Sequence, residues 1–342
     1  MKSFCGFRLF LFAIVLTVVP AWAQFPKIPK PSVPSVPSVP STVSTPKVPS
    51  ETDRVIKGAI ASALERTLKE EAPIQYDAVP YPSLGQLPGT PFSATGDSSI
   101  VLRQMAKSTD GTVQLPQGDY RIPVSTYSMR MSGASPNADV FALAPLRGKR
   151  ADMIWALNAR SVDAPLTQPQ VQAASWAVQS GMKYDEMPHD IQTVIDRLIP
   201  EFKPRLATSY YEQIKATWDG FSTKVSGLPL LDDALDRLGD VGKTIRKIHQ
   251  NSDEIKADAQ NFQAMAHLFA PPGPKAPAGG ATQWSVTAPG VYQRLLNPSS
   301  YDGPGSLEIR VTAKGAVAVT SLIASPFSQA QPLSMAPMKL KK

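Results

Sequence analysis

The chain has 342 residues, of which 42% are hydrophobic, and a formal net charge of +7. This length and composition fit a soluble, core-forming protein of one large or two modest domains. The single cysteine, Cys5, precedes an apolar run near the N-terminus, so no disulfide is expected in the mature chain. The positive charge could favour anionic envelope polymers, although solubility alone is the favoured explanation.

Residues 1–23 have the composition of a signal peptide. A short apolar run follows two basic residues, and Ala21-Trp22-Ala23 has the small-x-small form of a cleavage site. We expect cleavage before Gln24, which leaves a charge of about +5. No later stretch approaches the ~20 apolar residues that span a membrane. The mature protein is therefore expected in the periplasm or at the cell surface, and the lack of Asn-x-Ser/Thr sequons favours a bacterial envelope.

Residues 24–50 form a proline-rich segment. Its prolines recur at every third position: Pro31, Pro34, Pro37 and Pro40. A three-residue period is that of a polyproline II helix, so this segment predicts a stiff, solvated tether. A low-complexity linker without a specific role is the alternative. Residues 51–75 then predict an amphipathic helix that ends before Ala72-Pro73.

Residues 76–200 predict a mixed region of strands and helices. Its first part, residues 76–92, is rich in proline and is expected to lie extended over a surface. β-prone runs and helical spacing of apolar residues follow. The expected strands cover residues 99–102, 112–115 and 120–127, and the expected helices cover residues 150–159, 168–179 and 190–198.

Residues 201–272 predict a helical hairpin or a coiled coil. An amphipathic pattern covers residues 206–225, and in residues 231–269 apolar positions recur every seven residues in two registers. This seven-residue seam predicts one long helix. The helix could associate with a second copy of the chain, or it could fold back on residues 206–225; the intramolecular hairpin is favoured.

Residues 273–335 predict further strands, and residues 336–342 a basic tail. The expected strands cover residues 284–286, 290–292, 306–311 and 317–319. They are expected to complete the sheet that begins near Ile100, because neither set of strands alone makes a convincing core. The predicted fold class is therefore α+β, with sheet elements from both ends of the chain around a central helical region.

The sequence shows no recognisable catalytic or metal-binding pattern. Its three histidines, His189, His249 and His267, lack paired ligand spacing, and there is no G-x-S-x-G elbow and no glycine-rich phosphate loop. We expect no catalytic residue, no metal and no cofactor. The basic clusters at residues 147–150 and 243–247 are interpreted as solvated faces, and export argues against a nucleic-acid partner.

One ordered set of residues suggests a specific chemistry. Tyr127 and Ser128 end a predicted strand, a glycine- and proline-containing loop follows at residues 133–136, and Gln172 precedes Trp176 by four residues. Over about residues 115–181 this order resembles the thioester domains of Gram-positive surface adhesins. In that family a cysteine at the position of Ser128 and a glutamine at the position of Gln172 join as an internal thioester, which captures amines.

The resemblance lacks the residue that the reaction requires. Ser128 stands in place of the cysteine, and a thioester needs a thiolate leaving group. The segment between Ser128 and Gln172 is also compact for the family. We expect these two residues to meet as a buried hydrogen-bonded pair in a thioester-like binding pocket that includes Tyr127 and Trp176. Alternatively, Tyr127 and Trp176 are core residues and Gln172 supports a helix turn.

The expected function is non-covalent and non-enzymatic. The sequence predicts an exported bacterial envelope or cell-surface protein with a structural or adhesive role and no active thioester. Its partner would be an envelope polymer or a protein, or a second copy through residues 231–269. Two alternatives are a covalent or enzyme-like binder that uses a Ser128–Gln172 ester, and a carbohydrate-binding envelope module.

Overall fold

We describe the fold from a computed structural model, which covers residues 54–75, 84–105, 112–129, 141–258, 284–296, 304–326 and 332–338. The chain separates into a unit of residues 1–48 and a compact unit of residues 49–342, and all described residues belong to the second. The expected signal peptide, the tether, the loop at residues 133–136, the seam beyond residue 258 and most of the basic tail lie outside the described residues.

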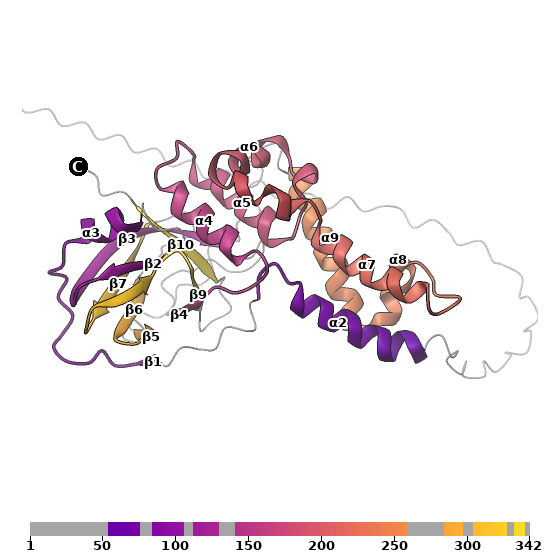
Figure 1. Cartoon of the computed structure of the whole chain (residues 1–342), viewed down its shortest axis with the longest axis horizontal. Helices are drawn as coiled ribbons and strands as arrows, with labels where there is room; N and C mark the ends of the chain where they lie inside the picture. The colour runs from indigo at the N-terminus through magenta and orange to yellow at the C-terminus, as the bar shows by residue number, and fades with distance from the viewer. Residues whose placement is uncertain are drawn as a thin grey trace, which may run out of the picture. The chain divides into compact units, whose positions relative to one another are not determined.

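The main sheet of the compact unit is eight-stranded and antiparallel, in the order β1-β5-β6-β7-β3-β10-β9-β4 (Figure 1). The strands are β1 (Leu84–Gly85), β3 (Gly118–Ser128), β4 (Phe141–Pro145), β5 (Trp284–Ala288), β6 (Val291–Leu296), β7 (Pro304–Val311), β9 (Leu322–Pro326) and β10 (Leu333–Pro337). The sheet curls until it nearly closes on itself. Strands from near its two edges come into contact, and the Leu143 N–H of β4 donates to Ser285 Oγ of β5 at 2.9 Å. A separate two-stranded ribbon pairs β2 (Thr112–Leu115) with β8 (Gly315–Ala318).

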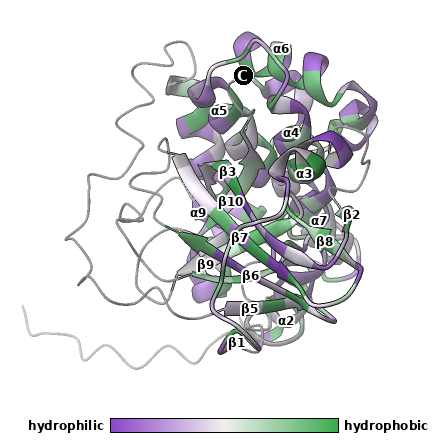
Figure 2. Ribbon diagram, turned by 90° about the vertical axis from the view of Figure 1, so that its left-hand side faces the viewer, coloured by the Kyte–Doolittle hydropathy of each residue, from purple (hydrophilic) through white to green (hydrophobic). Residues whose placement is uncertain are grey.

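The inner face of the curled sheet holds one hydrophobic core. Successive side chains of a strand point to opposite faces, so buried and partly exposed residues alternate along β6, and hydrophobic and polar positions alternate along the strands (Figure 2). Ile122 of β3 and Leu307 and Ile309 of β7 are fully buried in this core.

The outer face of the sheet is covered by an extended segment. The guanidinium of Arg310 binds both carboxylate oxygens of Asp119 and also donates to the main-chain carbonyls of Pro88, Thr90 and Pro91. These bonds hold residues 88–91 against β7 and β3. The predicted irregular course over a surface is thus observed at residues 88–91, whereas residues 84–85 form the strand β1.

A group of helices packs against the ends of β3, β9 and β10. It comprises α4 (Ala151–Ser161), α5 (Gln168–Gln179) and α6 (His189–Leu198), with the short helices η2 (Tyr184–Glu186) and η3 (Pro200–Leu206). Their second hydrophobic core includes Leu157, Val178 and Ile195, and it reaches Ile323 and Ala336 of the sheet.

A third core lies among helices from distant parts of the chain. These are η1 (Ile56–Ile60), α2 (Ala61–Glu70), α7 (Tyr210–Ser222), α8 (Leu231–Ala234), η4 (Leu235–Leu238) and α9 (Asp240–Asp258). Leu64 of α2, Trp218 of α7 and Ile245 of α9 meet in this core. No helix within the described ranges is long and apolar enough to cross a membrane.

The α+β class is confirmed, and so is the contribution of both ends of the chain to one sheet. β3 pairs with β7 on one edge and with β10 on the other. Four strands of this sheet, β1, β4, β9 and β10, were not predicted. β4 and β10 are buried at nearly every position rather than at alternate ones, so they lack the period of two that marks a half-buried strand.

The predicted strand at residues 99–102 is wrong, because this segment lies within helix α3 (Ser98–Met105). Asp97 Oδ1 accepts a hydrogen bond from the Ser99 main-chain N–H at 2.9 Å, and the Ile100 N–H bonds to the Asp97 carbonyl at 3.0 Å. An acidic residue that caps the first turn in this way favours a helix over the β propensity of Ile100 and Val101.

The predicted long helix of the seam is also wrong as a single element. The chain turns at Gly239, which has a φ of 61°, so η4 and α9 are separate helices. Gly242 packs against η4 so closely that a Cβ there would lie 1.9 Å from the Leu235 carbonyl oxygen. Within the described part of the seam, Leu231 and Ile245 are buried among helices of this same chain, which favours the intramolecular alternative.

Candidate functional site

Gln172 and Ser128 lie in direct contact. The Ser128 main-chain N–H donates to Gln172 Oε1 at 2.7 Å, and Gln172 Nε2 donates to the Ser128 carbonyl oxygen at 2.9 Å. Ser128 is 0% and Gln172 2% exposed. The side-chain amide thus pairs with the main chain of Ser128 in the manner of a neighbouring strand.

The sheet explains why Ser128 needs such a partner. β7 pairs with β3 only as far as Ser125, which lies opposite Pro304. On the other edge, the Met129 N–H bonds to the Pro332 carbonyl. Adjacent residues of a strand direct their main-chain polar groups to opposite edges, so those of Ser128 face the edge beyond the end of β7. Buried main-chain groups without a partner are costly, and Gln172 supplies one.

A second glutamine extends the same arrangement. Gln168 Nε2 donates to the Thr126 carbonyl at 2.8 Å. Four residues of a helix rise about 6 Å, and two residues of a strand span about 6.7 Å. Glutamines four apart on α5 can therefore reach alternate residues of β3. The sequence carries this signal in the spacing of Gln168 and Gln172, but the prediction included Gln172 alone.

The other two residues of the predicted pocket lie on either side of this contact. Tyr127 is buried, its hydroxyl lies 3.4 Å from Ser161 Oγ, and burial raises its pKa. Trp176 is buried one helical turn beyond Gln172 and lines a large groove together with Met129. The structure thus places all four residues along the end of β3 and the facing side of α5, but only Trp176 reaches the groove.

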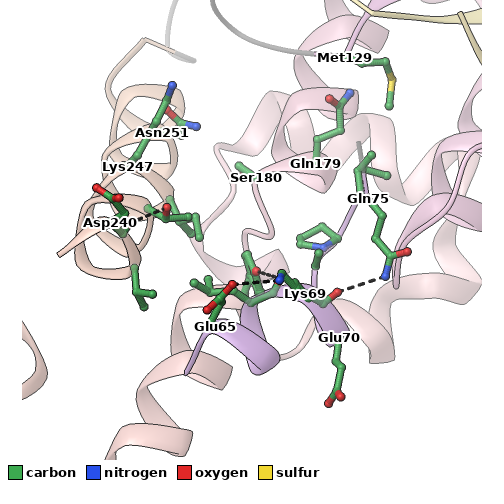
Figure 3. Close-up of a pocket in the computed structure, with 18 of the residues that line it drawn as sticks. Glu65, Lys69, Glu70, Gln75, Met129, Gln179, Ser180, Asp240, Lys247 and Asn251 are labelled. Carbon is green, nitrogen blue, oxygen red and sulfur yellow. Dashed lines mark hydrogen bonds and ion pairs between the residues drawn. The ribbon is translucent and has the colours of Figure 1, made fainter. Parts of the chain in front are cut away.

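The groove lies between α2, the end of α5 and α9, and has a volume of about 1170 Å³ (Figure 3). Lys247 and Asn251 project from α9, Glu65 and Lys69 lie on α2, and Gln179 lies at the end of α5. Binding clefts commonly have volumes of ~300–1,000 Å³, so this space is large enough for an extended ligand.

The lining of the groove combines apolar walls with amide and charged groups. Its hydrophobic residues are Leu68, Ala72, Pro73, Ile74, Met129, Trp176, Tyr210, Val241 and Ile248. The amides of Gln75, Gln179 and Asn251 can both donate and accept hydrogen bonds. Glu65 pairs with Lys69 at 3.0 Å. Such a lining can bind a partly apolar molecule that also carries main-chain-like polar groups.

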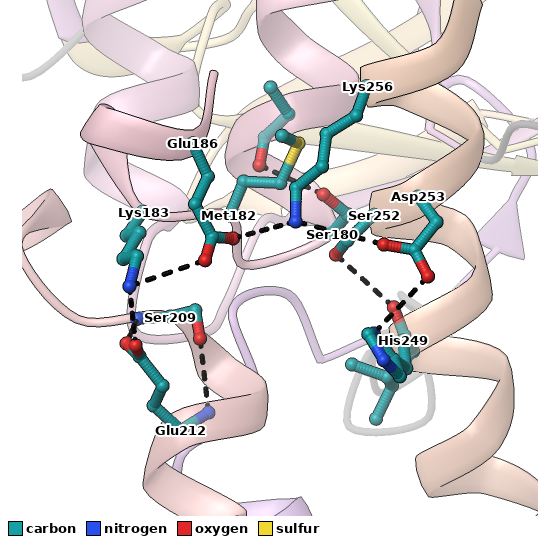
Figure 4. A network of polar contacts seen from close by, with 12 residues as sticks. Ser180, Met182, Lys183, Glu186, Ser209, Glu212, His249, Ser252, Asp253 and Lys256 are labelled. Atoms are coloured by element: carbon teal, nitrogen blue, oxygen red, sulfur yellow. Dashed lines mark hydrogen bonds and ion pairs between the residues drawn. The ribbon is translucent and has the colours of Figure 1, made fainter.

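A network of ion pairs holds α9 in place as one wall (Figure 4). Lys256 of α9 contacts Glu186 at 3.0 Å, and Lys183 contacts Glu186 at 3.3 Å and Glu212 of α7 at 2.6 Å. The hydrogen bond from Lys183 lowers the pKa of Glu212, and the same bond raises the pKa of Lys183. The network ties α9, η2 and α7 together beside the groove.

The histidines and carboxylates form no metal site among the residues that the structure describes. His249 stacks on Tyr211 with ring centroids 4.7 Å apart, and its Nδ1 lies 3.5 Å from Asp253. His189 begins α6, as the first residue of that helix. His267 lies outside the described residues.

Comparisons of the chain with protein-family models, with curated proteins and with solved structures find no match. The thioester-domain resemblance therefore stays a prediction that rests on Tyr127, Ser128, Gln172 and Trp176. The groove was not predicted, because its walls come from residues 65–75, 176–180 and 240–251, and no local pattern marks segments that meet only in the folded chain.

Proposed function

We propose that this chain is an exported bacterial envelope or cell-surface protein that binds an extended peptide segment of a partner without a covalent bond. The groove between α2, α5 and α9 would bind the peptide, and the hydrogen bonds between Ser128 and Gln172 would stabilise the fold. The observation that carries this proposal is the groove itself, with its apolar walls and its three amide side chains. Export is inferred from the signal-peptide pattern of residues 1–23.

A peptide suits this groove better than a sugar. Sugar sites usually present an open aromatic face, but the aromatic residues of this lining, Trp176 and Tyr210, are both buried. Gln75, Gln179 and Asn251 carry amide groups of the kind that an extended main chain pairs with. Gln75 and Gln179 also donate within the chain, to the Lys69 carbonyl and to Ser175 Oγ. The aliphatic walls suit alternate apolar side chains of the same peptide.

Hydrogen bonding at Gln172 supports a non-covalent mode. An ester with Ser128 would form by attack of the hydroxyl on the Gln172 amide carbon, with loss of ammonia. The Gln172 Nε2 and Oε1 instead donate and accept one hydrogen bond each with the Ser128 main chain. A primary amide makes both bonds, whereas an ester has no N–H and would remove the hydrogen bond from Gln172 Nε2 to the Ser128 carbonyl.

The test is a selection of displayed peptides on the immobilised mature protein, followed by calorimetric titration. Thr244 is exposed and lines the groove, so Thr244→Trp should fill it without disturbing a core. We expect selected peptides to lose at least about tenfold in affinity for this variant, about 1.4 kcal/mol. Gln250→Trp is the matched control, an exposed position of α9 outside the groove lining.

Two results would contradict the proposal. Equal peptide affinity for Thr244→Trp and Gln250→Trp would place the binding surface elsewhere. Binding of glycan strands in the groove, with no peptide selected, would favour the carbohydrate-binding alternative.

A further inference from the structure

A second, smaller cavity lies beside the groove, at the start of α4 and α7. Its volume is about 220 Å³, and it is lined by Glu71, Pro73, Lys149, Arg150, Met153, Arg205, Tyr210 and Gln213. Three of these residues are cations and one is an anion. A water molecule occupies about 30 Å³ of liquid, so the cavity has room for a small oxyanion of five heavy atoms.

Arg150 is the buried cation of this cavity and is only 5% exposed. Its Nη1 donates to the Met182 carbonyl at 2.7 Å and its Nη2 to the Thr208 carbonyl at 3.0 Å. A guanidinium has five N–H donors, so three remain after these two bonds. Among the described residues no carboxylate forms an ion pair with it, and its charge is therefore balanced only by carbonyl dipoles.

The other charges of the cavity are already matched. Lys149 pairs with Glu71 at 3.2 Å, and Arg205 pairs with Asp152 at 2.5 Å. These four side chains are between about two-fifths and three-fifths exposed, so they form a solvated rim around the buried Arg150. Counted together, the rim is neutral and the cavity keeps one positive charge, that of Arg150.

We propose that this cavity binds a phosphate-sized oxyanion, either free inorganic phosphate or the phosphomonoester end of a larger molecule. The planar guanidinium fork of Arg150 matches two oxygens of such an anion, and Lys149 and Arg205 contribute from the rim. Burial, with a contribution from the nearby Arg205, lowers the pKa of Arg150 to about 10. A bound anion would offset this penalty.

The site is independent of the peptide proposal. The two cavities share only Pro73 and Tyr210 in their linings. Thr244→Trp should therefore leave anion binding unchanged, so failure of one proposal can be told from failure of the other.

The experiment uses the mature protein and titrates inorganic phosphate against chloride at constant ionic strength. We expect a rise in Tm of about 2–4 °C when phosphate reaches ten times its Kd, and a further logarithmic rise above that concentration. Calorimetry then gives the Kd for inorganic phosphate and for glycerol phosphate. Binding of both indicates recognition of a phosphomonoester end, and binding of inorganic phosphate alone indicates a closed site; both support the proposal.

Variants separate the cavity from general charge effects. Arg205→Gln lies on the rim and should weaken phosphate binding about three- to tenfold, with little change of Tm in chloride. Lys203→Gln removes one charge from a partly exposed position outside the cavity and should change the Kd less than twofold. Arg150→Lys keeps the charge but loses the fork, and it should bind at least tenfold more weakly.

Three results would overturn the site. These are a Tm that rises no more in phosphate than in chloride, an equal loss of affinity in Arg205→Gln and Lys203→Gln, and an unchanged Kd in Arg205→Gln. If Arg150→Lys fails to fold, the Arg205→Gln and Lys203→Gln pair still decides.

Discussion

The two ends of α5 differ in what their polar side chains do. At Gln172 the helix meets β3, both residues of the contact are buried, and the donor and the acceptor of the amide each have a partner. Two turns later, the Gln179 side chain of the same helix lines the large groove (Figure 3). Ser128 and Gln172, whose order suggests chemistry, thus satisfy the hydrogen bonding of a sheet edge. The space for a ligand lies at the other end of α5.

The largest effect should follow from replacing Gln172. Gln172→Leu removes both hydrogen bonds between the side-chain amide and the buried main chain of Ser128, at about 1–3 kcal/mol for each bond. We expect the free energy of unfolding to fall by about 2–5 kcal/mol in urea denaturation. Gln168→Leu removes the hydrogen bond to the Thr126 carbonyl, which should cost about 1 kcal/mol. A loss below about 1 kcal/mol for Gln172→Leu would show that the contact does not hold the fold.

The groove at the Gln179 end of α5 is tested by the free energy of unfolding of a variant that fills it. Thr244→Trp should change the free energy of unfolding by less than about 0.5 kcal/mol, because the position is exposed. Unchanged stability together with the expected tenfold loss of peptide affinity would show that the groove serves binding and does not stabilise the fold. A variant that unfolds as readily as Gln172→Leu would instead mark the groove as part of the structural framework.

The smallest effect concerns the ion pairs that hold α9, and it depends on pH. The hydrogen bond from Lys183 lowers the pKa of Glu212 below its ordinary 4.5. The stabilisation is therefore complete above the ordinary value and is lost as the pH falls through the lower pKa of the folded state. The glutamine of Glu212→Gln can keep the hydrogen bond to the Ser209 N–H, so the variant removes mainly the charge.

We expect the Tm of wild type to exceed that of Glu212→Gln above about pH 5, by less than about 1 kcal/mol in stability because Glu212 is two-fifths exposed. The difference should shrink below about pH 4. Thermal unfolding of both proteins across this range measures it, and a difference that grows towards acid would contradict the assignment.

Local signals predicted much of the helical structure. α5 was predicted with the bounds that it has, and its start is marked by Thr167 and Gln170, which form a capping box. Asp97 is an equally local signal for the start of α3, but the strand prediction followed the β propensity of Ile100 and Val101. Gly239 likewise marks the turn that breaks the seam, although the seven-residue pattern continues across it.

The features that the sequence did not predict depend on contacts between segments that are far apart in the chain. Gln172 was expected to contact Ser128, and it does so through the main chain. The pairing of β3 with β7 stops at Ser125 and Pro304, which the sequence around Ser128 does not reveal. The groove depends on residues 72–75 lying beside α5 and α9, and the Arg150 cavity depends on Glu71 and Pro73 lying beside the starts of α4 and α7. In sequence, Arg150 reads as one of several solvated basic residues, and only the fold buries it.

The intact mass of the mature protein, compared with that of Ser128→Ala, tests the central claim most directly. Cyclisation of the expected N-terminal Gln24 would affect both proteins equally and cancels in the difference. If Ser128 and Gln172 are joined only by hydrogen bonds, wild type is heavier by about 16 Da, the mass of the hydroxyl oxygen. An ester would release ammonia, about 17 Da, from wild type alone. A wild-type protein about 1 Da lighter than Ser128→Ala would therefore contradict the account.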